Sequence, residues 1–209
     1  MNDEDRMKKA DDFTAPPADY NLFVPDGWFQ IALDPAERDR SIVALIDLQF
    51  KGVDNAPHLK EQLMRDLQKK AKSAYGIGGT ELYLSLLTAG PVPLASSLLV
   101  SVPSADEWPK CSDPEELLDH LAGRISGDEV ELGITHMEAA GEAVRLRRRS
   151  APDPVNQLGN SLPTTAVTYY VPIPATERWL MLNFSTPVDP LADQMVRLFD
   201  TVAGTLHWA

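Results

Sequence analysis

The chain has 209 residues, of which 44% are hydrophobic and 24% are charged. This length and composition predict one domain with a single sizeable core. A net charge of -12 argues against a general affinity for nucleic acid or anionic lipid, because both are bound largely through concentrated lysine and arginine. The sequence therefore predicts no nucleic-acid partner.

The only cysteine, Cys111, excludes an intramolecular disulfide and so a disulfide-stapled secreted scaffold. The first residues, "MNDEDRMKKADDFTAPPADY", are acidic and lack the apolar segment of a signal or transit peptide. We expect a cytoplasmic protein, with residues 1–19 as a mobile tail and residues 20–209 as a single α+β domain.

The first elements are a strand and a helix. "FVPDGWFQIAL", residues 23–33, reads as a strand that places Trp28 and Phe29 on opposite faces. Asp34, Pro35 and Glu37 have the spacing of a helix N-cap, a first helical proline and a capping-box acid. Apolar residues then recur at helical intervals, and Gly52 can end the helix in the left-handed conformation.

A second helix is expected over residues 57–75, where leucines and alanines recur about every four residues. Its other face carries five cations that we interpret as a solvated surface: Lys60, Arg65, Lys69, Lys70 and Lys72. "GIGGT" then follows a helix and lacks the lysine of a phosphate-binding loop, so it is interpreted as a turn.

Residues 82–102 carry no charge over a length that could span a bilayer. Gly90, Pro91 and Pro93 lie at the centre of this stretch and would break a transmembrane helix. Short apolar runs bounded by glycine and proline favour strands, so we predict a buried hairpin that turns at "AGPVP" and no membrane insertion.

Three more elements follow in chain order. Asp113, Pro114 and Glu116 repeat the cap signature and begin a short helix over residues 114–125. Period-two alternation broken at "AAG" predicts a second hairpin with arms at 128–138 and 142–150. The composition of residues 151–163 is that of a loop.

The opening and closing arms of a third hairpin are residues 165–173 and 178–186, joined by the turn "PATE". Pro172 is placed at a strand end, where a missing hydrogen-bond donor is tolerated. A final helix begins at Asp189 and Pro190 and carries the stripe Leu191, Met195, Leu198, Val202 and Leu206. Consecutive hairpins covered by amphipathic helices predict an α+β fold, an antiparallel sheet in an α/β/α sandwich.

Two segments carry a resemblance to a known family: "VPDGWFQIAL", followed by helices, and "TTAVTYYVPIPATERWLMLNFSTPV", followed by a helix. The order of elements resembles the PsbP-like α/β/α sandwich shared with the Ran-binding Mog proteins and bacterial proteins of that shape. The similarity covers element order from Phe23 to Trp208. Members of this fold are mostly binding or assembly factors, so the resemblance implies an interaction role. It also implies an accessory or immunity-type factor of a secretion or toxin system.

No pattern in the sequence predicts catalysis, a metal or a cofactor. The histidines His58, His120, His136 and His207 lie far apart, without the spacing of a zinc site. Cys111 precedes a helix start that could lower its pKa, with His120 or His136 as a base, but we interpret it as a structural cysteine. We therefore expect a protein that is not an enzyme.

"RLRRR" places Arg145, Arg147 and Arg149 on one face of a strand, a basic stripe in an acidic protein. Two interpretations remain open. If the hairpin turns at "AAG", Arg149 lies near Glu131 and the charge is neutralised across the strands. Otherwise the guanidinium groups form a docking face for an acidic partner.

Three functions remain open. The first is a cytoplasmic interaction protein with a protein partner. The second is a small-molecule or lipid-binding sandwich, with a pocket between sheet and helices formed by Trp28, Tyr83, Tyr169 and Trp179. The third is a hydrolase that uses Cys111 or a histidine. The sequence does not fix the oligomeric state.

Overall fold

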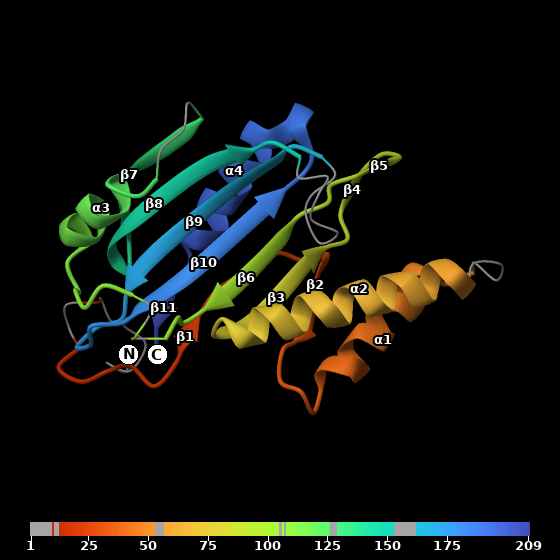
Figure 1. Ribbon diagram of the computed structural model, residues 1–209, viewed down its shortest axis with the longest axis horizontal. Helices are drawn as coiled ribbons and strands as arrows, with labels where there is room; N and C mark the ends of the chain where they lie inside the picture. The colour runs from red at the N-terminus through yellow and green to blue at the C-terminus, as the bar shows by residue number, and fades with distance from the viewer. Residues whose placement is uncertain are drawn as a thin grey trace, which may run out of the picture.

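The structure is a computed structural model that describes residues 10, 13–52, 57–104, 106, 108–125, 129–152 and 162–209. Its centre is a seven-stranded antiparallel sheet in the order β2-β3-β6-β10-β9-β8-β7 (Figure 1). The strands are β2 (Trp28–Ala32), β3 (Gly79–Ser85), β6 (Ser97–Ser101), β7 (Val130–Met137), β8 (Gly141–Ser150), β9 (Thr164–Pro172) and β10 (Trp179–Thr186). The predicted α+β class is confirmed.

All three predicted hairpins are present. β3 pairs with β6, β7 with β8, and β9 with β10. The first hairpin has an additional small ladder at its tip, between β4 (Thr88–Ala89) and β5 (Val92–Pro93). Gly90 adopts a positive φ of 61° between these two short strands, as its place in the predicted turn requires. The apolar stretch 82–102 is thus built into the sheet.

The α4 helix (Ala192–Ala203) packs on one face of the sheet and follows a 3-10 turn, η3 (Asp189–Leu191). Odd-numbered residues of β9 and even-numbered residues of β10 contact this helix, including Val167, Val171, Leu182 and Phe184. Phe184 stacks on Phe199 of α4 with ring centroids 5.0 Å apart. The predicted stripe continues to Leu206, which lies beyond the helix end and is still fully buried.

The other face carries the remaining helices, α1 (Arg38–Gln49), α2 (Pro57–Gly76) and α3 (Pro114–Ala122). α1 and α2 cover β2 and β3, and α3 covers β7 and β8, so the middle of this face lies between them (Figure 1). Trp28 and Phe29 contact opposite cores, as the strand alternation predicts. Four of the five cations on α2 are exposed and Lys60 is half-buried.

Several predicted boundaries are wrong. The strand that was predicted to begin at residue 23 begins at Trp28, and α1 begins at Arg38 instead of Pro35. The carboxylate of Asp34 accepts a hydrogen bond from the Ala36 amide, so residues 34–37 form a turn before the helix. Asp113 does cap α3 through the Glu115 amide at 2.8 Å, but α3 ends at Ala122, earlier than expected.

Part of the predicted tail is attached to the sheet domain. Ala10 donates to the Ala139 carbonyl, and the amides of Ala18 and Asp19 donate to that of Ala209. β1 (Tyr20–Asn21) pairs with β11 (His207–Trp208) next to these contacts. Residues 1–9, 11 and 12 lie outside the described part of the chain.

In the parts of the chain that the structure describes, the helices are all too short or too polar to cross a membrane.

Candidate functional site

The arginine stripe lies on β8, on the face of the sheet that carries α4. The register of the second hairpin places Glu131 directly opposite Arg147, and the Arg149 amide donates to the Glu129 carbonyl. The predicted proximity of Glu131 to Arg149 is wrong, because Glu131 lies opposite Arg147. Charge is nevertheless neutralised across the strands, since Arg147 pairs with Glu131 and Arg149 pairs with Glu129.

Each arginine also reaches a carboxylate on the C-terminal segment. Arg145 binds Asp200 through two hydrogen bonds, Nε to Oδ1 at 2.8 Å and Nη2 to Oδ2 at 3.2 Å. Arg147 Nη2 donates to Asp193 at 2.6 Å. Arg149 binds both oxygens of Asp189 at 2.9 and 3.2 Å, and its Nη1 also reaches Glu129 at 3.2 Å.

Arg145 is the least exposed of the three, with 21% of its side chain accessible. Burial alone would lower the pKa of this guanidinium, but hydrogen bonds to Asp200 and Tyr169 outweigh it and raise the pKa. The Tyr169 hydroxyl in turn donates to Asp200. Burial and the bond to Asp200 raise the pKa of Tyr169, so the phenol stays neutral in this cluster.

The stripe is therefore not a free basic surface. Five carboxylates surround the three guanidinium groups: Glu129, Glu131, Asp189, Asp193 and Asp200. The cluster as a whole carries an excess of two negative charges. We call it the β8–α4 ion-pair cluster, and its net charge is opposite in sign to that of the basic stripe that the sequence suggested.

The cluster borders an open edge of the sheet. β7 is the last strand in the order, and none of the other described strands pairs with its outer side. Two hollows lie beside it. One of about 310 Å³ is lined by Glu129, Val130, Glu131, Arg147, Arg149, Thr165 and Ala192. The other, of about 320 Å³, is lined by Glu131, Leu132, Gly133, Ile134, Thr135 and Arg145.

The four aromatic residues predicted to form one pocket lie on different faces. Trp28, Tyr83 and Tyr169 contact the core under α4, whereas Trp179 contacts Cys111 and Leu117 in the core under α3. The pairing of Trp179 with Pro172 fixes this difference, because Tyr169 and Pro172 point to opposite faces. The predicted pocket is therefore not formed.

An apolar groove does lie between helices and sheet, in a different place. Its volume is about 280 Å³, and it lies between α1 and α2 on one side and the end of β3 on the other. Five leucines line it together with three polar residues and an alanine: Leu45, Leu63, Leu67, Leu84 and Leu86, with Gln49, Ser85, Ser96 and Ala95. No sequence pattern predicts this groove, because its residues come from four separate segments.

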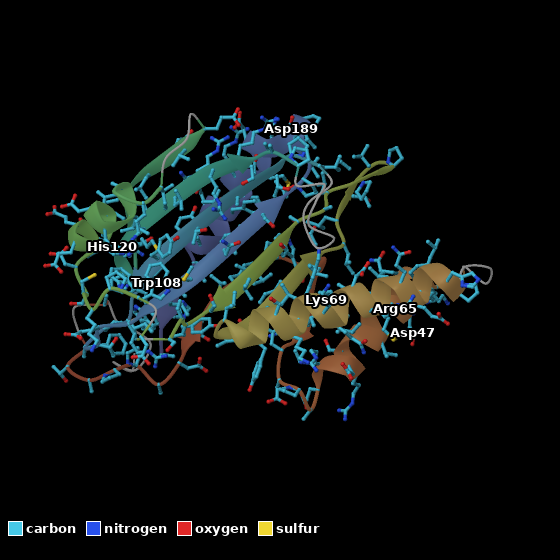
Figure 2. All side chains as sticks on the ribbon, in the orientation of Figure 1. Asp47, Arg65, Lys69, Trp108, His120 and Asp189 are labelled. Atoms are coloured by element: carbon cyan, nitrogen blue, oxygen red, sulfur yellow. The ribbon has the colours of Figure 1, made fainter. Side chains whose placement is uncertain are left out.

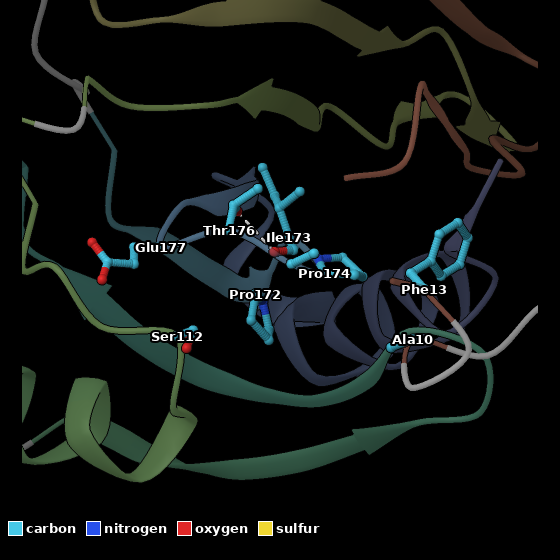
Figure 3. Close-up of a pocket in the computed structure, with 9 residues that line it drawn as sticks. Ala10, Phe13, Ser112, Pro172, Ile173, Pro174, Thr176 and Glu177 are labelled. Carbon is cyan, nitrogen blue, oxygen red and sulfur yellow. Dashed lines mark hydrogen bonds between the residues drawn. The ribbon is translucent and has the colours of Figure 1, made fainter. Parts of the chain in front are cut away.

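A larger hollow of about 570 Å³ surrounds the turn between β9 and β10. In Figure 3, Ser112 and Glu177 lie on one side of this turn, and Ala10 and Phe13 lie on the other. A serine nucleophile needs a base within hydrogen-bond reach, and no histidine is among the described lining residues. Ser112 therefore has no histidine base beside it among these lining residues.

Cys111 is buried, and its carbonyl accepts a hydrogen bond from the Trp179 indole at 2.9 Å. Burial raises the pKa of its thiol, and Glu116, Asp113 and Glu177 raise it further. This direction argues against the alternative in which the helix start lowers the pKa of Cys111. His120 lies on α3 (Figure 2), but within the described residues no hydrogen bond joins the thiol to it or to His136.

The described residues also contain no group of three or more histidine, cysteine, aspartate or glutamate side chains arranged to hold a metal ion.

The carboxylate of Glu81 has several hydrogen-bond donors around it. Glu81 accepts from the hydroxyls of Tyr20 and Tyr83 at 3.0 and 3.2 Å, and from Gln30 at 3.2 Å. Burial, followed by Glu81, raises the pKa of Tyr83 to about 12.

The sequence matches no model of a known protein family, and no curated protein matches it either. Function is therefore inferred from the geometry of the chain itself.

Proposed function

We propose that this chain is a non-enzymatic interaction protein of the cytoplasm, which binds a protein partner at the β7 edge of its sheet. The order of elements supports this proposal through its resemblance to the PsbP-like and Mog-type sandwich, a fold used mostly for binding and assembly. The same resemblance implies an accessory role in a secretion or toxin system.

The observation that carries the proposal is the exposed strand β7. An edge strand presents unpaired backbone groups, and proteins usually protect such edges with proline, several charges or a covering segment. Over its eight residues β7 has no proline, and its only ionisable side chains are those of Glu131 and His136. Ile134 lies on this edge with 38% of its surface exposed.

The opposite edge of the sheet is less suited to binding. β2 has five residues, against eight in β7. Trp28 of β2 packs edge-on against Phe199 of α4, with ring centroids 6.5 Å apart. β7 therefore offers the longer edge, and it also lies beside the charged cluster.

Capture of a partner tests this function. The purified, tagged protein is incubated with cytoplasmic extract of its own organism, and bound proteins are identified and quantified by mass spectrometry. We expect one protein to bind stoichiometrically to the wild type and to bind less to Glu131→Lys, because that change reverses an exposed charge at the edge.

Arg65→Glu is the matched control, since Arg65 is an exposed residue of α2 and lies well apart from Asp189 of the ion-pair cluster in Figure 2. It reverses one charge without touching the β7 edge, so capture should be unchanged. If the wild-type protein retains no more than an unrelated acidic bait does, the interaction function is wrong.

A second candidate function is the binding of a small apolar molecule or lipid chain in the leucine-lined groove between α1, α2 and β3. The groove supports it because ligand sites are mostly apolar hollows with a few polar groups. A fluorescent apolar probe such as aminoanthracene should bind the wild type, and Ala95→Phe should fill the groove and abolish binding. Equal fluorescence with both proteins would exclude this site.

A further inference from the structure

We propose that the partner contributes an extended segment that joins the sheet as an additional strand beside β7, with an aromatic side chain over Gly133 and a basic side chain toward Glu131. This inference rests on the proposed function and specifies the partner's chemistry.

Gly133 is the first reason. A glycine inside a strand lowers stability and often marks a place where another group approaches closely. The φ of Gly133 is not in the positive range that favours glycine, and a Cβ built on it would meet nothing within 4 Å. Neither backbone conformation nor packing within the described structure therefore requires glycine here, and the hollow beside it has room for a side chain from outside.

The direction of the backbone groups of β7 is the second reason. The Arg149 amide donates to the Glu129 carbonyl, and Val130 lies opposite Arg148. In an antiparallel pair, hydrogen-bonded and non-bonded positions alternate, so the odd-numbered residues of β7 bond to β8. The N–H and C=O groups of Leu132 and Ile134, and of the other even-numbered residues, therefore point outward and can pair with an added strand.

The two faces of the edge specify the partner's side chains. Val130, Leu132 and Ile134 lie on the α3 face, so they favour apolar residues in the partner. Glu131 and Gly133 lie on the α4 face, where the ion-pair cluster has its excess of negative charge. An aromatic ring can cover the glycine, and a neighbouring cation can reach Glu131, which is 65% exposed.

The test uses a fluorescently labelled peptide of about ten residues. One side of the peptide is valine, and the other places tyrosine between two lysines, a symmetric pattern that suits either strand direction. A second peptide has glutamate in place of lysine. Binding is measured by fluorescence anisotropy.

Two variants distinguish loss of peptide binding at the β7 edge from loss of the folded structure. Gly133→Val should raise the melting temperature by about 2 to 4 °C, because a β-branched residue favours a strand, yet it should fill the hollow and weaken peptide binding at least about tenfold. Ile134→Pro removes an outward N–H, and the preceding glycine lessens the steric conflict that proline imposes. Ile134→Val keeps the N–H and is the matched control.

The proposal requires that the lysine peptide bind the wild type and Ile134→Val, that both other variants lose about tenfold or more, and that the glutamate peptide bind more weakly. Lack of binding to the wild type, equal binding to Gly133→Val, or equal binding of the two peptides would overturn it. If the natural partner is captured equally by the wild type and by Gly133→Val, the interaction function stands and the site at β7 is wrong.

Discussion

Ala175 lies in the turn between β9 and β10 with a φ of 57°, in the left-handed region. This conformation costs a residue with a Cβ about 1 to 2 kcal/mol, whereas glycine adopts it freely. Ala175→Gly should therefore stabilise the protein by about 0.5 to 1 kcal/mol after the greater entropy of the unfolded glycine is subtracted. Urea unfolding measures the change, and a loss of stability would show that the turn is not held in this conformation.

Tyr83 makes stability depend on pH, because burial and the hydrogen bond to Glu81 raise the pKa of its hydroxyl. Its pKa is raised to about 12 in the folded protein, above the ordinary value of 10 for the unfolded chain. The contribution to stability is therefore complete below pH 10 and is lost as pH rises from about 10 to 12. Tyr83→Phe should be less stable at pH 7, because the bond to Glu81 is lost, and should lose less stability on going to high pH.

Chemical unfolding of both proteins at a series of alkaline pH values measures this difference. Parallel pH profiles for the wild type and Tyr83→Phe would mean that the pKa of the Tyr83 hydroxyl is not raised in the folded protein.

At the scale of elements, the β8–α4 ion-pair cluster fixes the C-terminal helix to the sheet. Asp200→Asn should cost about 1 to 2 kcal/mol, because it weakens a two-bond pair with the partly buried Arg145 and also affects Tyr169. Asp193→Asn is the matched control, since Asp193 is 70% exposed, and it should cost less than about 0.5 kcal/mol. Equal losses, measured by thermal unfolding, would contradict a special role for Asp200.

Strand alternation explains how much of the fold could be predicted. The second hairpin and the opposite faces of Trp28 and Phe29 follow from a period of two, and the first hairpin follows from glycine and proline at its turn; both are local properties. The start of α1 could not be predicted from the cap motif, because Asp34 satisfies the amide of Ala36 in a turn that precedes the helix. Such a turn and a capped helix share the same residue types.

The candidate site was predicted only in part, because its residues meet through tertiary structure. Spacing alone placed the three arginines on one face, but Asp189, Asp193 and Asp200 come from η3 and α4, which are distant in the sequence. With these carboxylates in place, the net charge of the surface is negative, whereas the arginines alone predicted a positive one. The predicted aromatic pocket depended on the register between β9 and β10. Trp179 pairs with Pro172, and this register places Trp179 on the opposite face of the sheet from Tyr169.

At the scale of the whole molecule, the sheet is covered unequally. α4 lies on one face, the other three helices lie on the opposite face, and β7 remains at the end of the sheet (Figure 1). The proposed function and the proposed partner segment both depend on this edge being open in solution.

Amide hydrogen exchange along β7 tests that claim most directly. In the isolated protein, the amides of Leu132 and Ile134 should exchange rapidly, whereas those of Glu131, Gly133 and Thr135, which bond to β8, should be protected. Nuclear magnetic resonance resolves the individual residues. Alternating protection would establish an open edge, and uniform protection of all five amides would show that the edge is already covered and that the partner must bind elsewhere.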